Sequence, residues 1–127
     1  MSECTKRILI FDEERFSRVC SALLEGEGYR TDTIMNGNNV AHGLNNNEFG
    51  LIVMSYPYGV YILRSLENTK IPIIILSDHM SRDLISMLEG IDNAYCMIKP
   101  IDFEKFRVLV RDVMNNNEIM NGGYKIV

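Results

Sequence analysis

The sequence lacks any apolar run long enough to cross a membrane, since a spanning helix needs roughly 20 predominantly apolar residues. Its first seven residues also lack the apolar core of a secretory signal peptide. Cysteine is scarce: the chain has three, Cys4, Cys20 and Cys96, widely spaced and without a CxxC pair. An odd number of separated cysteines indicates reduced thiols and disfavours a cysteine metal site. We therefore expect a cytoplasmic protein with no membrane partner.

Positive charge is also in deficit, with 13 Lys and Arg against 17 Asp and Glu, a net charge of -4 and an isoelectric point near 5.1. Nucleic-acid binding needs clustered Lys and Arg, so the composition argues against a nucleic-acid partner. A phosphate-binding glycine loop is missing too. The first strand-like segment leads into Phe-Asp-Glu-Glu-Arg-Phe at residues 11–16, which disfavours a nucleotide-binding α/β protein.

Strand-like and helix-like segments alternate along the chain, whose 127 residues and 46% hydrophobic content suit one domain with a single core. The predicted strands cover residues 7–11, 29–34, 51–54, 71–76 and 94–98. Apolar residues at helical spacing predict helices around residues 16–24, within 37–46 and 60–68, around 80–88, and from an N-cap at Asp102 onward. This alternation predicts an α/β fold, a doubly wound five-stranded parallel sheet in a three-layer sandwich.

The C-terminal residues interrupt this alternation. They are rich in Asn and Gly and then end in Tyr-Lys-Ile-Val. We expect one domain over residues 1–116 and a C-terminal tail over residues 117–127. The sequence leaves open whether the tail docks on the domain.

Polar residues follow four of the predicted strands. Asp12 and Glu13 follow the first strand, Ser55 the third, Ser77 the fourth and Lys99 the fifth. Because the carboxyl ends of parallel strands meet at one edge of a sheet, where ligands bind, we expect these side chains to lie together. A carboxylate pair, a hydroxyl and a lysine are the set used to transfer a phosphoryl group to a carboxylate. The acceptor carboxylate itself is missing, since the central strand ends in Ser55.

Three motifs lie on successive strand ends: Ile-Leu-Ile-Phe-Asp-Glu-Glu at residues 8–14, Pro-Ile-Ile-Ile-Leu-Ser at residues 72–77 and Met-Ile-Lys-Pro at residues 97–100. Together they resemble the receiver domains of bacterial two-component response regulators, over roughly residues 6–114. The resemblance implies a flavodoxin-like, CheY-like fold and a role in phosphorelay signal transduction. Receivers take a phosphoryl group from a histidine kinase onto an aspartate, with Mg2+ bound, and then change the face that they present to partners.

Residue by residue, the resemblance assigns Asp12 and Glu13 to the acidic pair that holds Mg2+, Ser77 to the hydroxyl that binds the phosphoryl group, and Lys99 to the lysine that neutralises it. Ser55 falls on the phosphoacceptor position. A serine hydroxyl is a poor nucleophile without an adjacent base, and its phosphoester is stable. The missing carboxylate also removes an anionic metal ligand, so we expect no cofactor and, at most, weak binding of Mg2+.

Two further positions depart from the receiver pattern. Asp78 follows Ser77, and its carboxylate would repel an incoming phosphodonor, which makes it a candidate for blocking the site. The residue three before Lys99, an aromatic switch residue in most receivers, is Cys96, with Tyr95 beside it. Both are therefore candidates for the switch position.

These features predict a degenerate receiver domain that is not an enzyme and that works as a phosphorylation-independent interaction module. We expect a protein partner, such as a histidine kinase or another signalling protein, or a homodimer through the face of the fourth and fifth predicted helices and the fifth predicted strand. The alternative is a receiver that is still phosphorylated at a non-standard acceptor, Asp12 or Asp78. Without a carboxylate at position 55, we also expect Lys99 to form an ion pair with Asp12, Glu13 or Asp78.

Overall fold

The computed structural model describes residues 7–12, 14–33, 49–58, 71–115 and 123–127, and the statements below concern these residues. The two short helices predicted within residues 37–46 and 60–68 lie outside them. No helix in the described part of the chain is long and apolar enough to span a membrane.

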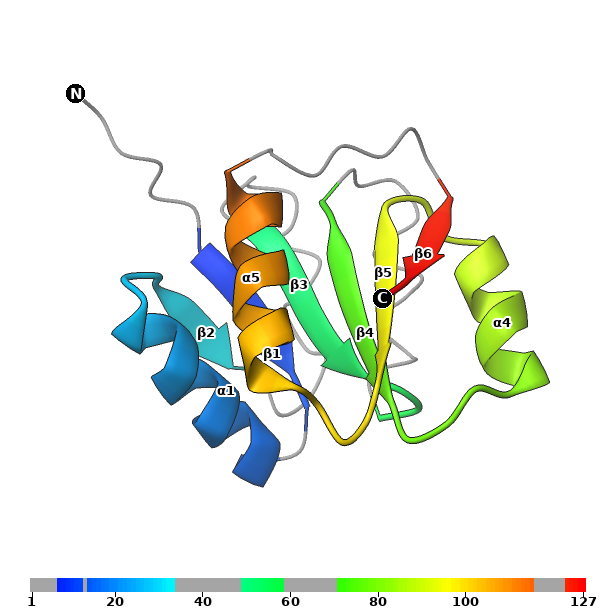
Figure 1. Ribbon diagram of the computed structural model, residues 1–127, viewed down its shortest axis with the longest axis horizontal. Helices are drawn as coiled ribbons and strands as arrows, with labels where there is room; N and C mark the ends of the chain where they lie inside the picture. The colour runs from blue at the N-terminus through cyan, green and yellow to red at the C-terminus, as the bar shows by residue number, and fades with distance from the viewer. Residues whose placement is uncertain (1–6, 13, 34–48, 59–70, 116–122) are drawn as a thin grey trace.

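A parallel sheet forms the centre of the fold (Figure 1). Its order is β2-β1-β3-β4-β5-β6, and every neighbouring pair is parallel. The strands are β1 (Arg7–Phe11), β2 (Thr31–Thr33), β3 (Phe49–Ser55), β4 (Ile73–Ser77), β5 (Ala94–Ile98) and β6 (Tyr124–Ile126). The predicted α/β class with a doubly wound parallel sheet is confirmed, and the sheet has six strands where five were expected.

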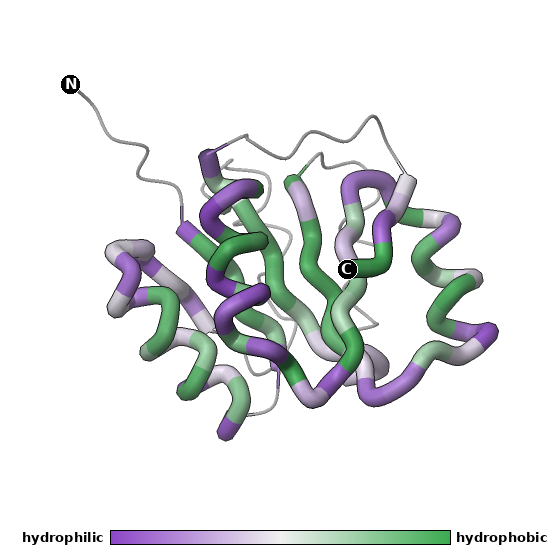
Figure 2. Tube along the Cα trace, in the orientation of Figure 1, coloured by the Kyte–Doolittle hydropathy of each residue, from purple (hydrophilic) through white to green (hydrophobic). Residues whose placement is uncertain are grey.

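The four central strands are hydrophobic along most of their length because both of their faces are covered (Figure 2). Alternate residues belong to two separate clusters. One face of the sheet carries Leu9, Phe11, Ile52, Met54, Ile73, Ile75 and Cys96. The other face carries Ile8, Ile10, Leu51, Val53, Ile74, Leu76, Tyr95 and Met97. The core therefore consists of two apolar layers with the sheet between them.

Three described helices cover these faces: α1 (Glu14–Gly26), α4 (Arg82–Glu89) and α5 (Phe103–Met114). Helices α1 and α5 pack on the same face, where α1 contributes Cys20 and Leu24 to the core (Figure 1). Helix α4 packs on the opposite face through Leu84 and Leu88. Val19 shares the apolar spacing of α1, but its side chain is 53% exposed.

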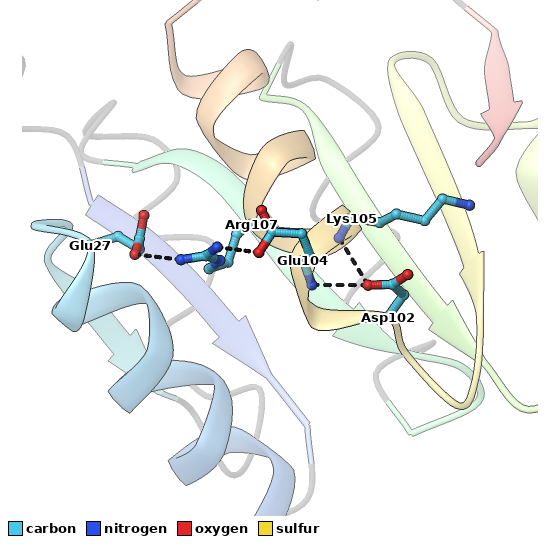
Figure 3. Close-up of polar contacts among 5 residues, drawn as sticks. All are labelled: Glu27, Asp102, Glu104, Lys105 and Arg107. Carbon is cyan, nitrogen blue, oxygen red and sulfur yellow. Dashed lines mark hydrogen bonds and ion pairs between the residues drawn. The ribbon is translucent and has the colours of Figure 1, made fainter.

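Side chains define the ends of two helices. Ser81 is the N-cap of α4, and its hydroxyl accepts a hydrogen bond from the Leu84 N–H at 3.1 Å. Asp102 is the N-cap of α5, as predicted. Its Oδ1 accepts hydrogen bonds from the Glu104 and Lys105 N–H groups at 3.0 and 3.2 Å (Figure 3). These oxygens satisfy backbone donors that have no partner inside the helix.

An ion pair connects the two helices on the α1/α5 face. Arg107 of α5 lies between Glu104, one turn earlier, and Glu27, which follows the end of α1 (Figure 3). The distance from Arg107 Nη1 to Glu27 Oε2 is 3.0 Å. The groups are partly exposed, so this contact orients the two helices more than it stabilises the fold.

The end of the predicted tail is part of the sheet. β6 pairs with β5 in the register Ala94↔Tyr124 and Cys96↔Ile126. The Asp92 carboxylate accepts a hydrogen bond from the Gly123 N–H at 3.2 Å. Gly123 has a φ of +78°, which glycine adopts without the steric cost of a side chain. The question that the sequence left open is thus answered for these residues: they dock on the domain.

Candidate functional site

The carboxyl ends of β1, β3, β4 and β5 lie at one edge of the sheet, because these strands are parallel neighbours. Two backbone hydrogen bonds connect neighbouring chain segments at that edge, where the strands end. The Tyr56 N–H donates to the Leu76 carbonyl at 2.8 Å, and the Lys99 N–H donates to the Ser77 carbonyl at 2.7 Å. The predicted site residues at the strand ends therefore belong to one region, as expected from the parallel topology. Glu13 lies outside the described residues.

Asp12 and Ser55 are in direct contact at this edge. The Ser55 hydroxyl donates a hydrogen bond to Oδ2 of Asp12. The two side chains are only 3% and 1% exposed. They meet because Phe11 pairs with Met54 in the sheet, so that the next residue of each strand is also adjacent. A buried carboxylate needs such donors, and Ser55 supplies one.

A second serine contacts Asp12, and the sequence did not point to it. Ser17, in α1, is buried, and its hydroxyl donates to the main-chain carbonyl of Asp12 at 3.1 Å. This bond holds the first turn of α1 against the end of β1. A serine inside a helix has no distinctive spacing, so the contact became visible only with the fold.

The expected ion pair of Lys99 with Asp12 or Asp78 is not formed. Among the described residues, the partner of the Lys99 ammonium is the ring of Phe16, whose centroid lies 5.1 Å from Nζ. Of the two described carboxylates, Asp12 accepts the Ser55 hydroxyl, and Asp78 is exposed to solvent. A cation over an aromatic face is a favourable electrostatic arrangement.

Ser77 is buried, and its hydroxyl is used locally. It donates to the main-chain carbonyl of His79 at 2.9 Å, within the turn that follows β4. Asp78 lies between these two residues and is exposed. This turn therefore presents a carboxylate to solvent at the edge where the strands end.

No protein-family model and no curated protein sequence matches the chain. Solved structures do. The N-terminal domain of a response regulator/sensory box/GGDEF three-domain protein from Carboxydothermus hydrogenoformans superposes with a TM-score of 0.72 and 17% identity, covering 88% of this chain and 96% of that one. The receiver domain of the sensor histidine kinase PA1611 from Pseudomonas aeruginosa PAO1, solved with a magnesium ion in its active-site cleft, gives 0.71 and 18%, covering 87% and 98%. The beryllofluoride-activated NtrC4 receiver domain dimer gives 0.68 and 21%, covering 88% and 98%.

The chain has the fold of a response-regulator receiver domain. The coverage is nearly complete for each of these domains, so the likeness extends over the whole receiver fold. This agrees with the resemblance seen in the three sequence motifs.

The described residues at this edge of the sheet include one of the two carboxylates assigned to Mg2+, Asp12, whereas Glu13 lies outside them. Mg2+ is bound in proteins by oxygen ligands, commonly one or two carboxylates with water and phosphate. Here the carboxylate that faces the strand ends is Asp12, and its Oδ2 already accepts the Ser55 hydroxyl. Position 55 contributes a neutral group. In the described part of the chain, no three His, Cys, Asp or Glu side chains cluster in the way that a metal ion requires.

The two switch candidates lie on opposite faces of β5 in the receiver fold. Cys96 is buried on the face that α4 covers, and Tyr95 is buried on the face that α5 covers. Burial raises the pKa of the Cys96 thiol. On α1, burial and the nearby negative charge of Asp12 raise the pKa of Cys20 to about 12. Both thiols are therefore protonated at neutral pH and poorly reactive.

A groove of about 320 Å³ runs between α5 and the β5–β6 pair. Its lining combines apolar side chains with charged ones: Tyr95, Asp102, Glu104, Lys105, Val108, Leu109, Asp112, Lys125 and Val127. The sequence did not predict it, because one of its walls is the β6 segment that was expected to be a tail.

Proposed function

We propose that this protein is a degenerate receiver domain in two-component signal transduction and that it works as a phosphorylation-independent protein-interaction module. One observation carries the proposal: the residue at the phosphoacceptor position, Ser55, is a buried hydroxyl that donates to Asp12. The receiver fold supports the signalling context.

The chemistry of this pair supports the loss of phosphotransfer. Asp12 is the neighbouring base, but a carboxylate is far less basic than a serine alkoxide, so it activates the hydroxyl poorly. A phosphoserine would also persist, which does not suit a reversible switch. Lys99, which would neutralise the phosphoryl group, lies over Phe16. We propose accordingly that Mg2+ binds weakly at best and that the protein is not an enzyme.

The partner surface follows from the fold. We propose that a protein partner, either a histidine kinase or another signalling protein, or a second copy of this chain, binds the face of α4, β5 and α5. The NtrC4 receiver neighbour is described as a dimer, which supports self-association as one use of this fold. The buried, unpaired thiols of Cys20 and Cys96 support a cytoplasmic location.

A second candidate function is a receiver that is phosphorylated at Asp12 or Asp78. Asp78 is the better placed of the two, because it is exposed at the end of β4 whereas Asp12 is buried and hydrogen-bonded. An acyl phosphate on Asp78 would keep the lability that a switch requires.

Incubation with acetyl phosphate and Mg2+ tests both candidates, with phosphate incorporation followed by intact-mass spectrometry. We expect no phosphate adduct on the wild-type chain. Stable labelling of the wild type would overturn the proposal. Label that disappears in Asp78→Asn but remains in Ser55→Ala would establish the second candidate.

A further inference from the structure

The outer edge of β5 is covered by a segment of the same chain. The Ala94 N–H donates to the Gly123 carbonyl at 3.2 Å, and the Val127 N–H donates to the Cys96 carbonyl at 2.9 Å. In Figure 1, β6 runs alongside β5, and α4 lies beyond it. A strand at the edge of a sheet offers unpaired N–H and C=O groups to any other strand, and here β6 fills that edge.

The contact that holds β6 is small. β6 pairs with β5 at three positions, whereas β4 pairs with β5 at five. Tyr124 is partly buried against the cluster that contains Leu84 and Leu88 of α4. The following apolar residues, Ile126 and Val127, are 51% and 41% exposed. A short ladder of hydrogen bonds, the Asp92–Gly123 hydrogen bond and the partly buried Tyr124 thus contribute to holding the strand, against the conformational entropy lost when it is ordered.

We propose that β6 is an autoinhibitory strand, which in the monomer covers the β5 edge through which two copies of this chain otherwise associate. This inference rests on the proposed function, since it names the regulation of the α4, β5 and α5 face. Release of β6 exposes the backbone groups of Ala94 and Cys96 that it had satisfied.

A second copy is the occupant that the residues favour. β5 reads Ala-Tyr-Cys-Met-Ile and carries no charge, so two β5 edges can pair across a two-fold axis without like charges facing each other. The outer edge of β6 is less suitable. Lys125 is its central residue, and a two-fold pair of β6 strands would place two lysines opposite each other.

The register of β6 allows the strand to be locked in place. Cys96 lies directly opposite Ile126, so Ile126→Cys places a second thiol across the β5–β6 pair. Oxidation joins the two sulfurs, with copper phenanthroline and oxygen accepting the two electrons and the two thiol protons released to solvent. Ile126→Ser is the matched control, because it changes the same side chain and cannot form the disulfide.

A second variant, which combines two substitutions, releases β6 from β5. Tyr124→Ala removes the buried anchor, and Val127→Pro removes the N–H that donates to Cys96. Hydrogen exchange of the β5 amides shows whether β6 has left, since the Ala94 N–H loses its acceptor. Circular dichroism establishes that the released variant is folded.

Analytical ultracentrifugation of each full-length variant measures self-association. We expect the released variant to dimerise with a dissociation constant at least about tenfold lower than that of the wild type. The oxidised Ile126→Cys variant should stay monomeric at concentrations where the released variant is dimeric, and its disulfide should lie within one molecule.

Three results would overturn the inference: a released variant that associates no more tightly than the wild type, an oxidised variant that dimerises as readily as the released one, or a disulfide found only between molecules. If the released variant does not fold, the locked variant still tests the inference. Dimerisation of the locked variant would by itself refute the proposal that β6 covers the edge through which two copies associate. Failure of the proposed function is read separately, from phosphate incorporation.

Discussion

The Ser55 hydroxyl and the Asp12 carboxylate form a buried hydrogen bond between the ends of β3 and β1, although the two residues are separated by 43 in sequence number. Under the proposed function, these two positions correspond to the acceptor carboxylate and to a metal-binding carboxylate. A hydroxyl in place of one carboxylate would replace a repulsive pair, which needs a cation, by a hydrogen-bonded pair.

Ser55→Ala should destabilise the protein by about 1–3 kcal/mol, because it leaves the buried Asp12 carboxylate without this donor. Urea denaturation at neutral pH measures the change in the free energy of unfolding. Ser86→Ala, at an exposed position of α4, is the control and should change it by less than about 0.5 kcal/mol. Equal effects of the two substitutions would show that the Ser55–Asp12 hydrogen bond adds no measurable free energy of unfolding.

Ser55→Asp should make the protein dependent on Mg2+. Two carboxylates would then meet in a buried place, so the variant should melt at a lower temperature than the wild type without metal. A divalent cation bound between them stabilises the folded state by mass action. Thermal melting with and without Mg2+ should show a larger increase for the variant than for the wild type. A Mg2+ effect of the same size in both proteins would contradict this.

The contact between Phe16 and Lys99 should be measurable as a coupling energy. In a double-mutant cycle with Phe16→Leu and Lys99→Met, we expect the two changes to be non-additive by about 0.5–1 kcal/mol, since the lysine is partly buried over the ring. Phe16→Tyr keeps an aromatic face and serves as the control, with the coupling retained. Strict additivity in the first cycle would mean that the Phe16 ring and the Lys99 ammonium do not stabilise each other.

Asp102→Ala should cost about 0.5–2 kcal/mol, because it removes the oxygen that accepts from two backbone N–H groups at the start of α5. Asp102→Asn keeps an oxygen in the same position and should preserve most of the stability. Chemical denaturation of the three proteins in parallel makes the comparison. If the asparagine variant is as unstable as the alanine variant, charge rather than capping is responsible.

The stability of the protein should fall in alkaline solution through Cys20. Burial, with the negative charge of Asp12, raises the pKa of Cys20 from 9.0 to about 12 in the folded state. Between these two values the folded protein holds a proton that the unfolded chain has lost, so the free energy of unfolding decreases as pH rises. The full stabilisation is present below pH 9.

Urea denaturation at a series of pH values from 8 upward measures this slope, which approaches about 1.4 kcal/mol per pH unit for one group. Cys20→Ala should flatten it while Cys96→Ala leaves the Cys20 contribution in place. An unchanged slope in Cys20→Ala would assign the alkaline loss to other groups, such as Tyr29, whose pKa burial also raises.

The sequence predicted those features that depend on local pattern. Continuous apolar runs marked β1, β3, β4 and β5, because strands buried on both faces need apolar residues at every position. The N-cap of α5 at Asp102 was predictable from a side chain that accepts from nearby backbone groups. The meeting of the strand ends followed from the parallel connections alone.

The partners of the site residues were not predictable in the same way. Lys99 was expected to pair with Asp12, Glu13 or Asp78. Its ammonium lies over the Phe16 ring, while Asp12 accepts the Ser55 hydroxyl, Asp78 is exposed, and Glu13 lies outside the described residues. The choice among such neighbours depends on distances that a sequence does not contain.

The sequence by itself determined the class of fold and the presence of a serine, not a carboxylate, at the end of the third predicted strand, since both follow from residue type and order. Only the tertiary structure decided what Ser55 does in place of that carboxylate, and that Tyr124–Ile126 becomes an edge strand on β5. Three residues are too short a pattern for a strand to be predicted from the sequence. Its backbone partners lie about thirty positions away in the chain, and the fold alone brings them together.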